Sequence, residues 1–466
     1  MLRTDIMAGC NLVHSDRIML NIEDASVEMS NLLNTLGYGQ ELRQKRRDCY
    51  KELDRLCEEF WSFNTFEWIT VGSKAEGLSR FLESDRDVLL VINNVECLEA
   101  GCDVNSIPEN ISVFRMDTQI CYPGHCILLL ERGFPLILLL ALCENAYGRV
   151  LLSSDAIIDI LRMGQYFFVR EPFFNQRSGP SLPISFGHSI FELVPALRCH
   201  CPSLLQKWAA RSRHWPPPNI VEKVVSMEAF LTPVGFKNSE NKHIEWRICF
   251  NTGETELMSN LNDTQLKLYV LLKMIAKHVL KPQHKEITSY MLKNIILWLA
   301  ENNPQSVFHE RSLFFWVRES LLEVRTALSQ KQLPYYMLPE RNLMAATAMT
   351  DMQNRTWIAT LTDMIDEGPY IIRRLPKVRQ TIISHPEPLF WFYARRIELE
   401  IIVLEMLKSV TPHIGGNVLG PIVRNGLLRR MVEILREVLE CSEEGPDLPI
   451  VYLVFRLIYR VLMDEL

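Results

Sequence analysis

The chain has 466 residues, 48% of them hydrophobic, which is enough for two or three domains or one large bilobal body and excludes disorder as the default. Lysine and arginine number 50 against 56 acidic residues. The resulting net charge of −6 excludes a global basic field, so any nucleic-acid binding must come from a local patch.

The twelve cysteines follow no regular spacing, and no apolar secretory leader follows Met1. This predicts free thiols without a disulfide framework and a cytoplasmic location. The longest apolar run, Phe134 to Cys143, is shorter than the roughly 20 residues of a membrane-spanning helix, so we expect no membrane contact.

Residues 1–40 are weakly periodic and predict only an irregular arm with one short helix. An amphipathic helix is predicted from Gln40 to Trp61, because its apolar side chains recur at helical spacing. These are Leu42, Cys49, Leu53, Leu56 and Phe60. Its outer face is predicted to carry basic residues that either contact phosphates or are simply solvated: Arg43, Lys45, Arg46, Arg47 and Lys51.

The stretch from Trp68 to Asn93 carries the strongest chemical signal. Side chains alternate along a strand, so Asp85 and Asp87 are predicted on one face and Arg86 on the other. Two carboxylates beside an aliphatic run favour a bound cation, although both could also open a solvated strand. The turn Gly72-Ser73 allows backbone N–H groups and a hydroxyl to approach a triphosphate. It lacks the Gly-Lys-Ser/Thr ending of a P-loop, which disfavours an NTPase of that class.

Four strands are predicted between residues 66 and 135, with a turn at Pro123-Gly124, and they indicate an α+β catalytic lobe. They are Phe66 to Val71, Asp87 to Ile92, Ser112 to Ile120 and Cys126 to Glu131. Two Cys/His groups lack Cys-x-x-Cys spacing, which favours buried thiols over zinc. They comprise Cys121, His125 and Cys126, and Cys199, His200 and Cys201.

A further strand, Ile190 to Leu197, carries Glu192 between apolar neighbours. An acid there needs a partner or a metal, and a two-metal site requires three or more acidic groups. The alternative is a surface acid on an edge strand.

The period becomes helical after the predicted strand Glu245 to Asn251. The predicted helices are Leu266 to Leu280, Ser289 to Asn302, Glu310 to Ser329, Arg395 to Lys408 and Leu427 to Leu439. We divide the chain into an arm (1–40), a spine helix with catalytic core (41–255), a helical lobe (256–345) and an accessory helical domain (346–466). The region after Leu343 is predicted to be a separable regulatory or interaction module.

Three ordered motifs resemble the male-abnormal (Mab) family of nucleotidyltransferase-fold proteins, which includes cyclic GMP-AMP synthase and its invertebrate receptor relatives. They are Gly72-Ser73 followed by Asp85-Arg86-Asp87, the strand Phe191 to Leu197, and Glu245 to Phe250. The resemblance extends from about residue 41 to residue 345, with Arg177 to Ser181 and Pro334 to Leu343 in their expected order. It implies a bilobal nucleotidyltransferase fold, a mixed sheet lobe plus a helical lobe, followed here by an extra C-terminal helical region.

The same resemblance implies roles for individual residues. Gly72 and Ser73 would bind the triphosphate, while Asp85, Asp87 and Glu192 would be catalytic and hold two Mg²⁺ or Mn²⁺ ions. It implies further nucleotide contacts by Arg247 to a base, by Lys273 to the phosphates and by stacking of Tyr290 on a base. From periodicity alone, Tyr290 is also consistent with a core position.

Several positions depart from the family pattern. Glu192 replaces the usual Asp, Val194 replaces a threonine, and Cys249 and Asn251 replace base-contacting serines, so the two bases are not specified. Asn262 to Gln265 is expected to connect the Arg247 strand directly to the next helix, without the zinc-binding insertion of the vertebrate enzyme. No zinc is therefore expected, and double-stranded RNA becomes a better candidate activator than DNA.

The sequence thus predicts a nucleic-acid-activated nucleotidyltransferase that makes a cyclic dinucleotide second messenger for innate immunity. ATP and GTP, or other NTPs, are the expected substrates, and a dimer on the activating ligand is possible. Two alternatives stay open: a catalytically inactive Mab-family nucleotide-binding or interaction protein, and a template-independent RNA nucleotidyltransferase that makes linear products.

Overall fold

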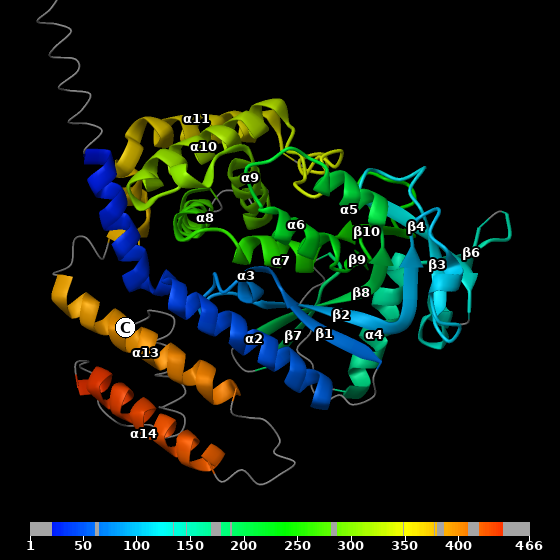
Figure 1. The fold of residues 1–466 in the computed structure, drawn as a ribbon, viewed down its shortest axis with the longest axis horizontal. Helices are drawn as coiled ribbons and strands as arrows, with labels where there is room; N and C mark the ends of the chain where they lie inside the picture. Colours follow the sequence, from blue (N-terminus) through cyan, green and yellow to red (C-terminus); the bar gives the residue numbers. More distant parts are fainter. Residues whose placement is uncertain are drawn as a thin grey trace, which may run out of the picture. The chain divides into compact units, whose positions relative to one another are not determined.

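The computed structural model describes residues 21–60, 65–133, 135–145, 147–168, 179–186, 189–280, 287–347, 349–376, 378–379, 386–408 and 419–440 (Figure 1). These residues form two compact units. One unit contains the sheet and comprises residues 40–211, 219–259 and 391–466. The helical unit comprises residues 1–39, 212–218 and 260–390. Arg177 and Ser178 of the family-like motif lie outside the described residues.

The sheet unit contains all the named strands. They are β1 (Phe66–Val71), β2 (Arg86–Leu98), β3 (Ser112–Asp117), β4 (His125–Arg132), β5 (Leu142–Glu144), β6 (Val150–Leu152), β7 (Leu182–Phe186), β8 (Ser189–His200), β9 (Ala229–Thr232) and β10 (Glu245–Cys249). The mixed helix and strand content predicted for this region is confirmed. The bilobal arrangement stays a prediction.

Strand β2 organises the sheet, because it pairs with β1, β3 and β8. The pairings continue from β3 through β4, β10 and β9 to β8, which returns to β2. An apolar cluster on one face of these strands contains Val71, Leu89, Val91, Ala196 and Phe230. Short helices complete the unit: α3 (Gly72–Ala75), α4 (Ser154–Phe168), α5 (Pro202–Ala209), α6 (Pro218–Val225) and α7 (Asn251–Ser259).

Two predicted strand ends were wrong for local reasons. Strand β3 ends at Asp117, because the Asp117 carboxylate accepts a hydrogen bond from the Gln119 amide at 3.0 Å and closes a turn. Strand β10 ends at Cys249, and helix α7 begins at Asn251. The expected direct connection to the next helix is therefore also wrong, because α7 lies within it.

The long helix α2 (Gln40–Phe60) confirms the predicted spine helix, but its predicted outer basic face was wrong. Arg43 is only 2% exposed and Arg46 is wholly buried. Lys45 pairs with Glu405 at 3.7 Å, and only Lys51 of the basic set is exposed. Most of this face is therefore covered rather than available to phosphates.

The helical unit is built from longer helices, three of which begin with a side-chain cap, from Asn262, Thr288 or Thr350. The longer helices are α8 (Asp263–Ile275), α9 (Ser289–Asn302), α10 (Leu313–Gln330) and α11 (Asp351–Glu367), with residues 21–33 also helical. Asn262 and Gln265 form a reciprocal capping box at the start of α8. The predicted helices at Leu266 to Leu280, Ser289 to Asn302 and Glu310 to Ser329 are confirmed.

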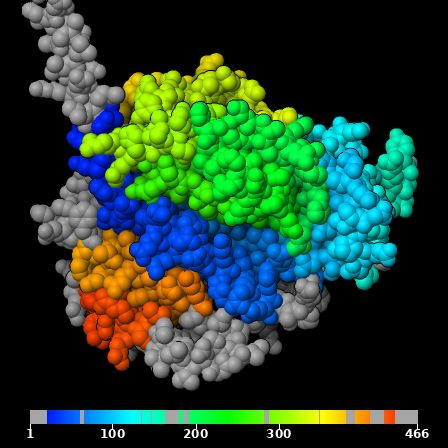
Figure 2. Space-filling model, viewed as in Figure 1, coloured from blue at the N-terminus to red at the C-terminus, as the bar shows by residue number. Residues whose placement is uncertain are grey.

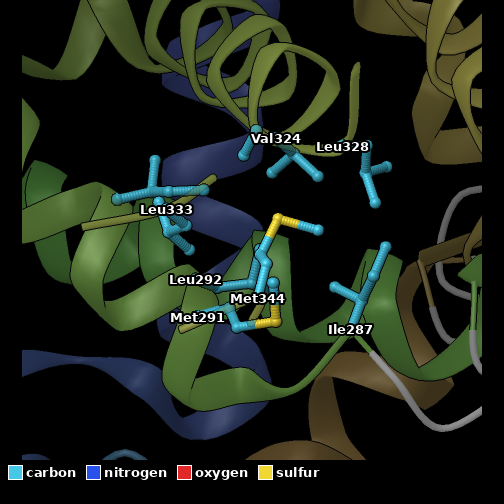
Figure 3. A pocket seen from close by; sticks show the side chains of 9 residues that line it. Ile287, Met291, Leu292, Val324, Leu328, Leu333 and Met344 are labelled. Atoms are coloured by element: carbon cyan, nitrogen blue, oxygen red, sulfur yellow. The ribbon is translucent and has the colours of Figure 1, made fainter. Parts of the chain in front are cut away.

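A small apolar pocket lies inside the helical unit. Figure 3 shows Met291 and Leu292 of α9 facing Val324 and Leu328 of α10, with Met344 between them. Its cavity volume of about 10 Å³ is at the lower limit for one water molecule, so it cannot hold a nucleotide. None of the helices in the described part of the chain combines the length and apolar character needed to cross a bilayer.

The C-terminal helices α13 (Pro386–Lys408) and α14 (Leu419–Glu440) confirm the two helices predicted there. Leu404 of α13 shares an apolar cluster with Leu42 and Cys49 of α2, and α13 lies alongside α2 (Figures 1 and 2). Residues 346–390 belong to the helical unit and the residues from Trp391 on to the sheet unit. That the region after Leu343 is separable stays a prediction, and the shared cluster weighs against it.

Candidate functional site

Three neighbouring strands bring two of the predicted site residues, Asp87 and Glu192, into one row. Asp87 on β2 lies opposite Val71 at the end of β1 and opposite Glu192 on β8. Residues paired directly across adjacent strands point to the same face. Asp87 and Glu192 therefore stand together at the edge of the apolar cluster that Val71 and Leu89 contribute to.

Gly72 explains how closely the turn approaches this row. Its φ of +68° is a left-handed conformation that glycine adopts without a steric penalty. A Cβ atom on Gly72 would lie 2.9 Å from Oδ2 of Asp87, so the carboxylate occupies the space that a side chain would need. Ser73 follows within the four-residue helix α3. The predicted Gly-Ser turn and the predicted acid are thus in direct contact.

The electrostatics of Glu192 reflect a crowded acidic site. Burial is the main factor that raises the pKa of its carboxyl, and the negative charge of Asp85 raises that pKa further. Asp87 and Ser181 act in the opposite direction. Asp85 itself is exposed and precedes the first residue of β2. Within the described residues, no three His, Cys, Asp or Glu side chains are placed to hold one metal ion.

Arg86 points to the opposite face, as predicted, and is buried there. Its Nη2 donates to Oδ1 of Asp54 at 2.6 Å, and its Nε donates to Oγ1 of Thr70 at 2.9 Å. The rings of Tyr50 and Phe191 lie 5.7 Å from the guanidinium. This links α2, β1 and the acid-bearing strand β2.

Sequence reasoning missed Asp54, although the Thr70 amide and hydroxyl also donate to it at 2.8 and 2.5 Å. It lies beside the apolar stripe of α2, between Leu53 and Leu56. Nothing in that local pattern identifies its partners, which lie 16 and 32 positions away.

The remaining predicted nucleotide contacts lie elsewhere. Arg247 is half-buried on β10, opposite Thr232 of β9 and His125 of β4. Lys273 and Tyr290 lie in the helical unit, where Lys273 sits 5.7 Å from the Tyr269 ring. Tyr290 is half-buried, 5.9 Å from the ring of Tyr335. The stacking role and the core role of Tyr290 both stay predictions.

One cysteine from each of the two Cys/His groups behaves as an interior thiol. Cys126 and Cys199 are buried, and burial raises the pKa of the Cys126 thiol far above its ordinary value. Hydrogen bonding to Cys201, followed by burial, raises the pKa of the Cys199 thiol in the same way. The raised pKa keeps both thiols in the protonated form at neutral pH. The absence of zinc stays a prediction.

Two family models match adjacent parts of the chain. Residues 185–260 match the Mab-21 protein nucleotidyltransferase domain, and residues 249–360 match the Mab-21 protein HhH/H2TH-like domain. Residues 185–360 are of the Mab-21 type. The predicted resemblance to the Mab family is therefore confirmed. This Mab-21-type region contains Glu192, Arg247, Lys273 and Tyr290, whereas Gly72, Ser73, Asp85 and Asp87 precede it.

Curated relatives carry two kinds of name. A cyclic GMP-AMP synthase-like receptor of Tribolium castaneum is 26% identical over 216 residues, which cover 45% of this chain and 48% of the relative. The receptor of the same name from Aethina tumida is 27% identical over 142 residues, 30% of this chain and 35% of the relative. A mab-21-like protein of Drosophila melanogaster is 22% identical over 187 residues, 37% of this chain and 50% of the relative. The chain thus spans at most half the length of these relatives.

Proposed function

We propose that the chain is a nucleotidyltransferase that converts two nucleoside triphosphates into a cyclic dinucleotide. The observation that carries this proposal is the row of Val71, Asp87 and Glu192 across three strands. Gly72 lies so close to the Asp87 carboxylate that a side chain on it would not fit. The nucleotidyltransferase description of the matched domain and the receptor names of two relatives support it.

The acidic residues fit hard divalent cations, because Mg²⁺ and Mn²⁺ prefer carboxylate oxygens. Asp87 and Glu192 are neighbours, and the Asp85 charge already influences Glu192. Asp85 is exposed ahead of β2, so we expect its carboxylate to turn toward the other two when metal binds. Two cations bound there would neutralise charge on the triphosphate and on the leaving pyrophosphate.

The residues of the chain would orient two successive transfers. The backbone and hydroxyl of Gly72-Ser73 hold the donor triphosphate. A ribose hydroxyl of the acceptor attacks the donor α-phosphorus: a new P–O bond forms, the bond to pyrophosphate breaks, and the hydroxyl proton leaves to solvent. A second transfer in the opposite sense closes the ring and releases the second pyrophosphate. Arg247 and Tyr290 would contact bases, and Lys273 the phosphates.

The proposal extends to partners. We expect ATP and GTP as substrates and double-stranded RNA, rather than DNA, as activator. We further propose a cytoplasmic protein, a dimer on its ligand, and a second-messenger role for the product in innate immunity.

A catalytically inactive Mab-family protein is the second candidate, and one observation favours it. The acidic, His and Cys side chains in the described part of the chain do not form a preassembled metal group. The mab-21-like names of other relatives fit this candidate equally well.

The test is a product analysis. Purified protein is incubated with all four NTPs and Mg²⁺ or Mn²⁺, with and without double-stranded RNA or DNA, and products are identified by mass spectrometry. A cyclic dinucleotide, lighter than its linear 5′-triphosphate intermediate by one pyrophosphate, supports the proposal. Linear oligonucleotides alone would indicate the RNA nucleotidyltransferase, and unchanged NTPs that nevertheless bind would indicate the inactive protein.

A further inference from the structure

The segment of residues 76–84 joins the Gly72-Ser73 turn to Asp85 and Asp87, and side chains from two helices hold its backbone. Arg46 of α2 donates from Nη1 to the Gly77 carbonyl at 3.3 Å. Glu400 of α13 accepts from the Phe81 amide at 3.0 Å. Lys74 of α3 also contributes, because its Nζ donates to the Arg80 and Phe81 carbonyls, each at 2.6 Å. The path of this segment is therefore fixed by charged side chains.

Glu400 is the hub of these contacts. Arg46 binds it with two parallel hydrogen bonds, Nε to Oε1 at 2.7 Å and Nη2 to Oε2 at 2.9 Å. Arg396 donates to Oε2 at 3.4 Å, and all three side chains are fully buried. Burial acts to raise the pKa of Glu400, but the Arg46 and Arg396 charges outweigh it and hold that pKa below its ordinary value. The group is thus a buried Arg–Glu–Arg triad with an ionised centre.

Apolar contacts fix the same segment. Phe81 packs against the cluster formed by Leu42, Cys49 and Leu404 and also against the cluster between α13 and α14. Leu82 packs against the second of these clusters. A buried ion triad adds little net stability compared with apolar residues of similar volume, and in some proteins such buried polar groups select one geometry instead. The triad therefore favours one backbone conformation of residues 76–84.

We propose that Glu400 is a positioning residue for the nucleotide site. Glu400 lies beyond the Mab-21-type region, which ends at residue 360, so the C-terminal helices contribute to the site from outside it. By fixing Phe81 and the 76–84 segment, Glu400 sets where Asp85 stands relative to Gly72. The inference rests on the proposed function only for its effect on nucleotide binding, because the effect on the segment is independent of catalysis.

The test compares three variants of the full chain by hydrogen exchange with mass spectrometry and by Mn²⁺·ATP binding. Glu400→Gln removes the central charge. The triple variant Arg46→Met, Arg396→Met, Glu400→Met replaces the triad with apolar side chains that can fill the same volume. Glu405→Gln is the matched control on α13, because Glu405 is partly exposed and pairs with Lys45 and Lys408, each at 3.7 Å, outside the buried triad. Peptides from β8 report any general loss of stability.

We expect the triple variant to exchange amides of residues 76–84 at least about tenfold faster than wild type, while β8 is unchanged. Its affinity for Mn²⁺·ATP should fall by a similar factor, and Glu405→Gln should match wild type. Exchange in 76–84 equal to wild type in both the triple variant and Glu400→Gln would overturn the inference. If the triple variant does not fold, the test uses Glu400→Gln alone. Amide exchange in residues 76–84 is then compared with amide exchange in β8 in the same way. A wild-type chain that binds no ATP would refute the proposed function, while the exchange result would still decide the role of Glu400.

Discussion

Asp87 and Glu192 lie directly opposite each other on the parallel strands β2 and β8. A shift of one residue in this register would turn Glu192 to the other face of the sheet. Val194 and Ala196 lie on the same face as Glu192 and contribute to the apolar cluster there, which fixes the register. The position of the third acid is therefore a consequence of core formation.

Activity should survive replacement of Glu192 by Asp but not by a residue that lacks a carboxylate. Glu192→Asp retains a carboxylate within a methylene of the original position, so measurable activity should remain. Glu192→Gln and Glu192→Ala remove the carboxylate that we propose binds metal, and we expect a loss on the order of 100-fold in rate. Pyrophosphate release measured over a range of Mg²⁺ concentrations checks this. Wild-type turnover by Glu192→Gln at low Mg²⁺ would mean that the residue is a bystander.

Gly72 should be required for its lack of a side chain as well as for its backbone conformation. Gly72→Ala forces a Cβ within 2.9 Å of Asp87 Oδ2, so Mn²⁺·ATP binding should fall at least about tenfold. Gly101→Ala is the control, because Gly101 also has a positive φ of +91° but no atom within 4 Å of the added Cβ. Each variant should lose about 1–2 kcal/mol of stability from backbone strain. Equal ATP affinity in the two variants would contradict the close approach of the turn to Asp87.

The accuracy of the sequence predictions depended on whether the determining contacts were local. Helix α2 and strand β1 follow from periodicity within their own residues, and both were predicted. The environment of Arg46 was not, because its partner Glu400 lies 354 positions later in the chain. Asp87 and Glu192 were both predicted as site residues, but their direct pairing requires the β2–β8 register, which no local pattern contains.

The Arg86–Asp54 pair should be important for stability. Arg86→Met leaves the largely buried Asp54 carboxylate without its cation, which should cost about 3 kcal/mol in the free energy of unfolding. Asp54→Asn combined with Arg86→Met should recover part of this loss, because the unpaired charge is removed as well. Urea denaturation of the single and double variants measures the coupling. A loss below about 1 kcal/mol for Arg86→Met would show that the pair is not needed to hold β2.

Charge reversals on α2 should separate folding from RNA binding. Lys51 is exposed, so Lys51→Glu should weaken binding of double-stranded RNA and reduce the salt dependence by about one counterion. Arg46→Glu should instead disrupt folding, because it places two carboxylates together in the buried triad. Fluorescence anisotropy at several salt concentrations checks the first expectation. Lys237→Glu serves as the control, because Lys237 is an exposed lysine outside α2. A folded Arg46→Glu variant would contradict the second.

The most direct measurement is pyrophosphate release by the double variant Asp85→Asn, Asp87→Asn under conditions in which wild type turns over. Both changes remove the charge of a proposed metal ligand without removing a core contact, so the thermal midpoint should stay within a few degrees of wild type. Glu109→Gln, an exposed acid away from the row, serves as the control. We predict that the double variant releases no pyrophosphate above background while Glu109→Gln behaves as wild type. Retained turnover in the folded double variant would contradict the assignment of Asp85 and Asp87 as the centre of a nucleotidyltransferase site.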